Sequence, residues 1–204
     1  MDIFGISLPS LKKNIFLASI KESKGQIIVF TPNPEMLLKM RKDKEFREIL
    51  SQADFLISDG IGLYIAYQIL DSKLPFFLNI LALPYYFFNL FFRRKKLYQK
   101  YGERICGSDM TRYLLKEAQK EGKKVAVVDL YSPDDEKKLA IQAGFIQKIQ
   151  KLYPKISLQL FIWNPQDKKN IMKNIQNYSP DFLFSTLGMK QQEENILEIM
   201  KTCP

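Results

Sequence analysis

The chain has 204 residues, 46% of them apolar and 26% charged, so it is long enough to bury one sizeable core and is not of disordered composition. It contains no histidine, which excludes Ser-His-Asp and Cys-His catalysis and leaves Asp, Glu, Lys or Tyr as general acids or bases. The formal net charge of +9 indicates an anionic partner: nucleic acid, anionic lipid or a phosphorylated substrate. The two cysteines form no CxxC motif and the start shows no secretory signal, so we expect a reducing, cytoplasmic setting.

Apolar, β-rich runs alternate with segments of helical periodicity along the chain. The expected strands cover residues 2–8, 26–31, 55–58, 123–130, 156–163 and 181–186. The expected helices cover a segment through Lys21 that Ser10 caps, then 34–43, 45–52, 61–70, 109–120, 134–150, 166–178 and 191–200. Continuous apolar strands separated by helices predict a mostly parallel sheet with helices on both faces. We therefore expect one α/β domain, residues 1–204, with Rossmann-like layering.

The segment 74–104 interrupts this alternation with a mostly apolar, aromatic-rich run followed by a basic cluster. Aromatic side chains beside cations suit a membrane interface with anionic headgroups. The residues expected to contact the membrane are Phe87, Phe88, Phe91, Phe92, Arg93, Arg94, Lys95 and Lys96. Two alternatives stay open: a helical pair buried in its own domain or in a dimer, and a span, for which the run is barely long enough.

Four groups of polar or glycine residues stand where expected parallel strands end. They are Thr31 and Asn33 in "TPNPEML", Asp59 in "SDGIG", Gly107 and Ser108 before the helix that starts near Asp109, and Gly188 with Gln192 and Glu193 in "STLGMKQQEEN". Ligands of open parallel sheets bind beyond the carboxyl ends of the strands, where helix N-termini also point. Each group alone has a plainer explanation as a helix cap, a solvated first turn or a packing glycine.

The stretches "TPNPEML", "ADFLISDGIGL", "ERICGSDM" and "LGMKQQEENI", in this order, resemble the WecG/TagA/CpsF family of bacterial glycosyltransferases, glycosyltransferase family 26. The resemblance covers nearly the whole chain outside the aromatic segment. It implies transfer of an N-acetylhexosamine, commonly N-acetylmannosamine, from a UDP-sugar to a polyprenyl-diphosphate-linked amino sugar. The implied transfer inverts the anomeric centre and requires no metal, and its products feed teichoic acid or capsule-type polymers.

The resemblance also implies roles for single residues. Asp59 looks like the general base that deprotonates the acceptor hydroxyl, and Thr31 and Asn33 look like groups that orient the reacting sugar or acceptor. The other implied substrate-binding positions are Gly60, Gly62, Arg104, Gly107, Ser108, Asp109, Gly188, Lys190, Gln192 and Glu193. Apart from the resemblance, a strand-end carboxylate is suited to such a base. The adjacent acids Asp134 and Asp135 make a poor metal site without further ligands.

Two departures from the family pattern stand out. Lys190 replaces the usual proline of GxPxQE, which changes the stiffness of the turn and brings a cation toward the expected diphosphate. The sequence stops at "MKTCP", where family members usually continue into an arginine-bearing appendage that serves membrane attachment and site closure. We therefore expect segment 74–104 to take over attachment to the inner face of the cell membrane, and place the activity of the chain alone in doubt.

Three rival readings stay open. The first is a catalytically impaired homologue that binds a UDP-sugar and acts as a membrane-associated scaffold or regulator. The second, a dinucleotide oxidoreductase, lacks a G-x-G-x-x-G after its first strand. The third, a nucleic-acid-binding module, has no recognition helix for its basic cluster, so we expect no nucleic-acid partner. The resemblance also allows a homo-oligomer.

Overall fold

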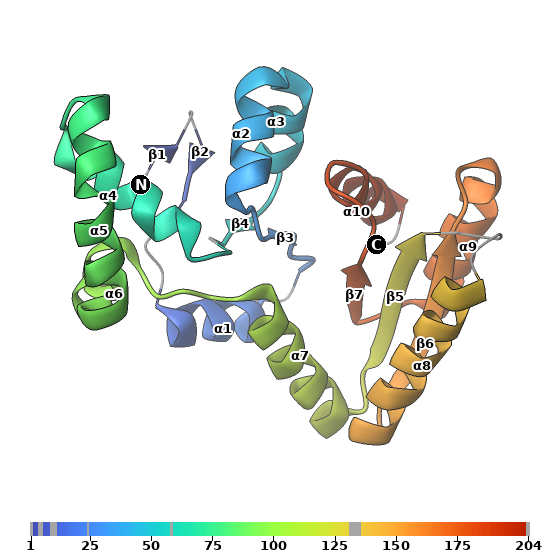
Figure 1. Ribbon diagram of the computed structural model, residues 1–204. Coiled ribbons are helices and arrows are strands. Elements are labelled where there is room, and N and C mark those ends of the chain that lie inside the picture. Colours follow the sequence, from blue (N-terminus) through green and yellow to red (C-terminus); the bar gives the residue numbers. More distant parts are fainter. Residues whose placement is uncertain are drawn as a thin grey trace. The chain divides into compact units, whose positions relative to one another are not determined.

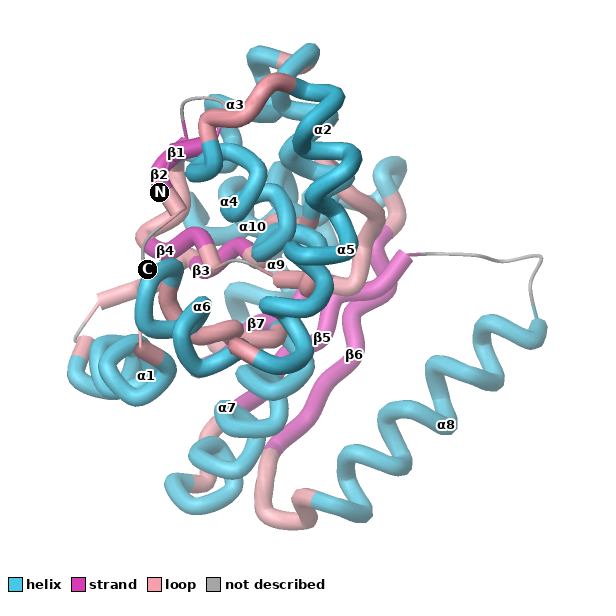
Figure 2. The backbone as a smooth tube through the Cα atoms, turned by 60° about the vertical axis from the view of Figure 1, so that its left-hand side comes forward, coloured by secondary structure: helices cyan, strands magenta, loops and turns pink. Residues whose placement is uncertain are grey.

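The computed structural model describes the chain except residues 1, 4–5, 9–11, 24, 58, 131–135 and 203–204. Short strands alternate with helices along the chain (Figure 1), and helices predominate over strands (Figure 2). Ser10 and the Asp134–Asp135 pair lie outside the described residues. Parallel strand pairs with intervening helices confirm the predicted α/β class.

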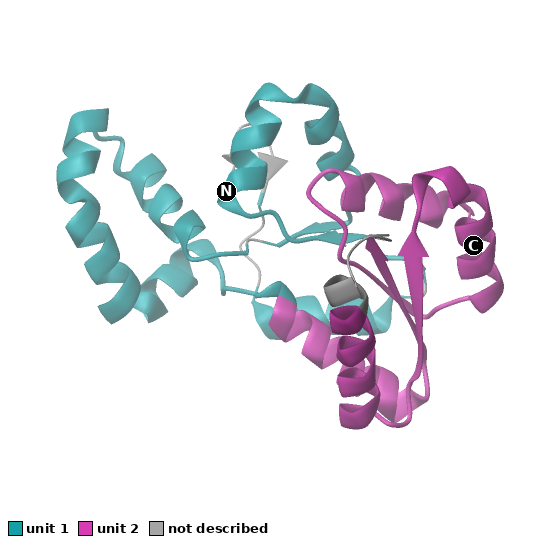
Figure 3. Ribbon diagram, turned by 45° about the vertical axis from the view of Figure 1, so that its right-hand side comes forward, with its two compact units in different colours: residues 1–107 teal, residues 108–204 magenta. Residues whose placement is uncertain are grey.

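The described chain forms two compact units (Figure 3). Unit 1 covers residues 1–107 and unit 2 covers residues 108–204, and each is described by itself. Each unit contains its own pair or trio of parallel strands. The expectation of a single domain stays a prediction.

Unit 1 contains the parallel strands β3 (Val29–Phe30) and β4 (Phe55–Leu56), with Val29 opposite Phe55. Both strands are shorter than predicted, since the sequence indicated strands over 26–31 and 55–58. At the start of β3, the Ile28 N–H donates to the Asp54 carboxylate at 2.7 Å instead of to a strand backbone. The predicted strand 2–8 is also corrected: β1 (Asp2–Ile3) and β2 (Ile6–Ser7) pair antiparallel, so the chain reverses between them.

Two of the three N-terminal helices of unit 1, α2 and α3, begin at side-chain caps. Helix α1 spans Lys13–Glu22, α2 spans Pro34–Lys42 and α3 spans Lys44–Ser51. Pro34 takes the first helical position of α2, as predicted, since its ring fixes a helical φ and the missing N–H is not needed there. The Asp43 carboxylate accepts from the Phe46 N–H at 2.9 Å and starts α3. Apolar side chains from these helices are fully buried, namely Phe16, Met40, Phe46 and Leu50.

The rest of unit 1 is a helical lobe made of α4 (Gly62–Ser72), α5 (Phe76–Phe92) and α6 (Arg94–Tyr101). Two tyrosine pairs hold α6 against α4, Tyr64 with Tyr98 and Tyr67 with Tyr101, each with ring centroids 5.4 Å apart. In the described part of the chain, no single helix has the length and apolarity to cross a membrane, but α5 and α6 together, bent by 94°, pass on length and composition alone.

Unit 2 is a three-stranded parallel sheet in the order β6-β5-β7, formed by β5 (Lys124–Leu130), β6 (Ser157–Trp163) and β7 (Phe182–Ser185). Its helices are α7 (Gly107–Glu121), which starts at the last residue of unit 1, α8 (Glu136–Leu152), the 3₁₀ turn η1 (Pro165–Asp167), α9 (Lys168–Tyr178) and α10 (Gln191–Thr202). Successive side chains of β5 contribute to two different cores. Ala126 and Val128 pack toward α9 and α10, and Val125 packs toward α7 and α8. Helices therefore cover both faces of this sheet, as predicted.

Candidate functional site

Asp59 lies where the β3–β4 pairing continues past the strand ends. The Ile57 N–H donates to the Phe30 carbonyl at 2.9 Å, and the Asp59 N–H donates to the Pro32 carbonyl at 3.2 Å. These bonds fix Asp59 beside the turn that carries Thr31, within unit 1. The carboxylate is only partly buried, and no hydrogen bond or ion pair to it is formed within the described part of the chain. It is therefore open to accept a hydrogen bond from a bound molecule.

Gly107, the first residue of α7, lies beside Thr31 and Asp59. A Cβ at Gly107 would stand 3.7 Å from the Thr31 Oγ1 and 3.8 Å from the Asp59 Oδ2. The Thr31 hydroxyl, the Asp59 carboxylate and Gly107 thus lie together within unit 1. Because Gly107 has no side chain, no Cβ occupies the position beside both oxygens. Thr31, Asp59 and Gly107 are the three predicted site residues that the structure brings together.

Gly60 and Gly62 have structural explanations. Gly60 has a φ of +100°, a left-handed conformation that glycine adopts without strain. A Cβ at Gly62 would come within 3.2 Å of the Pro34 Cγ, which is tighter than most side-chain contacts. Both glycines therefore let the turn after β4 pack closely against the start of α2, and this packing sets the position of Asp59.

Asn33 is the N-terminal cap of α2. Its Oδ1 accepts a hydrogen bond from the Met36 N–H at 2.9 Å, which satisfies one of the free donors of the first turn. This engagement leaves the amide Nδ2 as the group that could contact a ligand. The orienting role of Asn33 stays a prediction beside this structural one.

The remaining predicted residues around α7 are accessible. Arg104 is exposed, and its Nη2 lies 3.8 Å from the Sγ of Cys106. Ser108 and Asp109 follow Gly107 in the first turn of α7, and both are exposed. An acidic residue in a first helical turn complements the helix dipole, which gives Asp109 a structural role as well.

The last predicted group lies in unit 2, at the turn between β7 and α10. Here Glu193 is 1% exposed, and its two carboxylate oxygens accept hydrogen bonds from the Lys190 N–H at 2.7 Å and the Gln192 Nε2 at 2.5 Å. The bond to the N–H of the residue before the helix is half of a capping box. Burial raises the pKa of the Glu193 carboxyl, although its hydrogen bonds act in the opposite direction.

Lys190 adopts a left-handed backbone with a φ of +74°. Two residues earlier, the Gly188 carbonyl accepts a hydrogen bond from the Gln192 N–H at 3.0 Å. A proline, whose ring fixes φ near −65°, has neither this φ nor the N–H that Glu193 binds. The departure from the GxPxQE pattern therefore carries a change of backbone conformation, which the sequence pattern alone does not reveal.

The predicted membrane-contact residues lie at the C-terminal half of α5 and the start of α6, and all eight are exposed: Phe87, Phe88, Phe91, Phe92, Arg93, Arg94, Lys95 and Lys96. The N-terminal half of the same face was not predicted, and there Phe76 and Leu81 are 81% and 74% exposed. Helical spacing from Phe88 and Phe91 was the signal that could have found them. Among the described residues, no group of three or more Cys, Asp or Glu is placed to hold a metal ion.

A family model described as the glycosyl transferase WecG/TagA/CpsF family matches residues 1–96 and 88–203. The chain belongs to this family. The match reaches both the Asp59 turn of unit 1 and the Glu193 turn of unit 2, so both turns lie within WecG/TagA/CpsF sequence.

Three curated relatives carry the name N-acetylglucosaminyldiphosphoundecaprenol N-acetyl-beta-D-mannosaminyltransferase. The protein from Bacillus subtilis strain 168 is 27% identical over 176 residues, covering 86% of this chain and 56% of its own length. The Bacillus spizizenii and Staphylococcus aureus MRSA252 proteins are each 23% identical, covering 95% and 97% of this chain. The chain spans 62% and 66% of the length of these two WecG/TagA/CpsF proteins, and thus less than two thirds of each relative.

Proposed function

We propose that this chain carries the catalytic part of an inverting transferase that moves an N-acetylhexosamine from a UDP-sugar to a polyprenyl-diphosphate-linked amino sugar. The donor sugar is N-acetylmannosamine and the acceptor carries N-acetylglucosamine, in line with the names of the relatives. The observation that carries the proposal is the convergence of Thr31, Asp59 and Gly107 at one place in unit 1. Family membership supplies the reaction class.

The chemistry assigned to Asp59 is general base catalysis. Its carboxylate accepts the proton of the acceptor hydroxyl while the hydroxyl oxygen forms a bond to the anomeric carbon of the donor sugar. The bond from that carbon to the UDP oxygen breaks on the opposite face, so the configuration inverts and UDP leaves with the electron pair. One positioned base contributes about 10² to 10⁴ in rate. A carboxylate without hydrogen-bond partners among the described residues suits this task.

Thr31 and the N–H groups at the start of α7 are assigned to orientation and to charge stabilisation. The Thr31 Oγ1 lies next to the same open space as the Asp59 Oδ2, so it can hydrogen-bond the sugar or the acceptor. The N-terminal end of a helix favours anions, because the helix dipole is positive there. Arg104, Ser108 and Asp109 are assigned to binding of the nucleotide-sugar in the proposal.

The turn before α10, in unit 2, is assigned to substrate binding, as the family resemblance implies. In this proposal Glu193 holds the turn through its bonds to Lys190 and Gln192, and the exposed backbone of Gly188 faces the ligand. The transfer needs no metal in the proposal, because helix N-termini and cationic side chains neutralise the developing charge on UDP. The lipid-linked acceptor places the protein at the inner face of the cell membrane.

The test is UDP release by the 204-residue chain from a panel of UDP-N-acetylhexosamines, with and without a polyprenyl-diphosphate-GlcNAc analogue. We expect release that depends on the acceptor and is fastest with the N-acetylmannosamine donor. NMR of the product should show the anomeric configuration inverted relative to the donor. Absence of acceptor-dependent release from a folded chain that still binds a UDP-sugar would contradict transfer and support the scaffold reading instead.

A further inference from the structure

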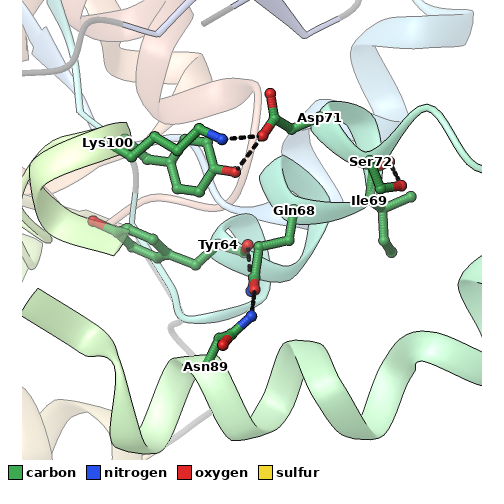
Figure 4. Close-up of polar contacts among 8 residues, drawn as sticks. Tyr64, Gln68, Ile69, Asp71, Ser72, Asn89 and Lys100 are labelled. Atoms are coloured by element: carbon green, nitrogen blue, oxygen red, sulfur yellow. Dashed lines mark hydrogen bonds and ion pairs between the residues drawn. The ribbon is translucent and has the colours of Figure 1, made fainter. Parts of the chain in front are cut away.

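Helix α5 has its polar side chains on the inside. Asn79 and Asn89 are buried against α4, where the Asn89 Nδ2 donates to the Gln68 Oε1 at 3.0 Å (Figure 4). The Tyr86 hydroxyl donates to the Asn79 Oδ1 at 2.6 Å. Buried polar groups that are hydrogen-bonded in this way hold a helix in one rotational setting. The polarity of α5 is therefore reversed relative to a helix on the surface of an ordinary globular domain.

The outer face of α5 is apolar and exposed. With 3.6 residues per turn, the exposed positions cover roughly 200° of the helix circumference. Their side chains are mostly aromatic: Phe76, Phe77, Leu78, Ile80, Leu81, Tyr85, Phe87, Phe88, Phe91 and Phe92. A contiguous apolar face of this size marks an interaction site rather than a solvated surface.

A basic run adjoins this face at the C-terminal end of α5. Arg93, Arg94, Lys95 and Lys96 are all exposed, and no carboxylate within the described residues forms an ion pair with any of them. The Arg93 guanidinium lies 5.7 Å from the centre of the Phe88 ring, which joins the cationic and aromatic parts of the surface. Residues 74–102 contain no Asp or Glu.

The lobe holds this basic run in a fixed place. Lys100 and Tyr101 of α6 both bind the Asp71 carboxylate of α4, the tyrosine hydroxyl at 3.1 Å (Figure 4). The Tyr64 hydroxyl donates to the carbonyl of Gly102, just after α6, at 3.0 Å. These contacts tie the C-terminal end of α6 to α4, and α6 is bent by 94° from α5 at the basic run.

We propose that the outer face of α5 and the basic run 93–96 form a docking surface for an anionic lipid bilayer, with α5 lying in the interfacial plane. The partner follows from charge complementarity, because cations beside exposed aromatic rings match anionic headgroups above acyl chains. A second copy of the surface would offer no acidic group to the basic run. A 17-residue helix is about 25 Å long, shorter than the roughly 30 Å hydrocarbon layer. The inference deepens the proposed function, since the acceptor is lipid-linked, but its readout does not depend on transfer.

The experiment is flotation of the 204-residue chain with vesicles of phosphatidylcholine alone or with 30% phosphatidylglycerol. We expect binding to the anionic vesicles that weakens as salt rises, because screening acts on exposed charges. Changing residues 93–96 to Gln should weaken binding more than a hundredfold, since each basic residue contributes about fivefold near an anionic surface. The matched control changes four exposed lysines of unit 2, Lys148, Lys151, Lys155 and Lys173, to Gln, and should keep at least a tenth of the binding.

A second variant tests the apolar face. Phe77→Gln, Leu81→Gln and Phe91→Gln together remove three side chains from its centre and should abolish flotation at low and high salt. The control carries Ile141→Gln, Phe145→Gln and Leu152→Gln, three exposed apolar residues of α8, and should float like the parent chain. Light scattering on the same proteins tests the alternative occupant of this face, a second copy of the chain. A parent chain that self-associates through the face and ignores vesicles would overturn the proposal, as would equal losses in test and control variants.

The depth of α5 is measurable by fluorescence. The chain has one tryptophan, Trp163, which is 2% exposed in unit 2 and serves as an unquenched reference. Phe91→Trp adds a reporter at the centre of the face. Lipids brominated at shallow acyl positions should quench the added emission more than lipids brominated near the chain ends. Stronger quenching from the deep positions would contradict an interfacial helix and indicate a span.

Discussion

The turn of Asp59 in unit 1 and the turn of Glu193 in unit 2 look alike in sequence, since each sets a carboxylate near a glycine between a strand and a helix. In the structure they are opposites. Asp59 is partly buried with no hydrogen bond to its carboxylate from the described residues, whereas Glu193 is buried and accepts two hydrogen bonds. The comparison separates an acid available for chemistry from an acid that holds a turn together.

The first way to break this comparison is to remove each carboxylate. Glu193→Ala should lower the free energy of unfolding by about 2 to 3 kcal/mol, because it leaves the partly buried Lys190 N–H without the Glu193 acceptor and removes a buried side chain. Asp59→Ala should change it by no more than about 0.5 kcal/mol, because no hydrogen bond is lost. Denaturant unfolding of both variants measures the two values. Equal destabilisation would show that Asp59 is structural too.

The second prediction concerns the backbone of Lys190, whose N–H donates to the Glu193 carboxylate. Lys190→Pro, which restores the family's GxPxQE pattern, should destabilise the chain by about 2 kcal/mol or more, because proline cannot reach a φ of +74° and has no N–H for Glu193. Lys190→Gly should instead stabilise it by up to about 1 kcal/mol, since glycine adopts this φ without strain. A control, Lys169→Gly in α9, should cost about 1 kcal/mol. A stable Lys190→Pro variant would mean that the turn adopts another conformation.

The third prediction concerns Gly107, which lies beside the Asp59 carboxylate. In Gly107→Ala, the new methyl group would meet the Thr31 Oγ1 and the Asp59 Oδ2 at ordinary contact distances, so the fold should tolerate it. Access to both oxygens should fall, and with it acceptor-dependent turnover, by about tenfold, or 1.4 kcal/mol of transition-state stabilisation. Gly144→Ala in α8, where nothing lies within 4 Å, is the matched control and should leave turnover unchanged. Equal activity of both variants would remove Gly107 from the site.

The fourth follows from the protonation of Glu193. Its pKa is raised above the ordinary value of 4.5, so the folded chain binds this proton more tightly than the unfolded chain does. The contribution of Glu193 to stability is therefore greatest below about pH 4.5 and falls as pH rises through the raised folded pKa. Glu193→Gln, which cannot ionise, should lack this fall. As pH rises above 4.5, the free energy of unfolding of Glu193→Gln should increase relative to that of the parent chain. A difference that does not change with pH would contradict a pKa raised by burial.

Much of the fold follows from local patterns, and the exceptions come from single side-chain contacts. The strands of unit 2 were predicted to within one residue at each end, because their apolar runs are long and helices cover both faces of the sheet. In unit 1, β3 begins later than predicted because the Asp54 carboxylate takes the Ile28 N–H that a longer ladder would need. Such a side-chain bond between distant residues leaves no periodic signal in the sequence.

The site was predictable only in part for the same reason. Strand ends and glycines located Thr31, Asp59 and Gly107, which the structure brings together. The sequence could not distinguish the free Asp59 carboxylate from the buried Glu193 carboxylate, since burial depends on packing across the whole turn. In α5, Asn79 and Asn89 are buried and bond to residues of α4, which leaves the aromatic face outward.

The most direct measurement is the turnover of Asp59→Asn at saturating UDP-N-acetylhexosamine and lipid-linked acceptor, together with its affinity for the donor. The account predicts that kcat falls by about 10² to 10⁴ while the donor Kd stays within about threefold, because the base is lost but the binding groups are kept. Turnover within a few-fold of the parent chain would contradict the assignment of Asp59 as the base. A loss explained by weaker donor binding alone would contradict it as well.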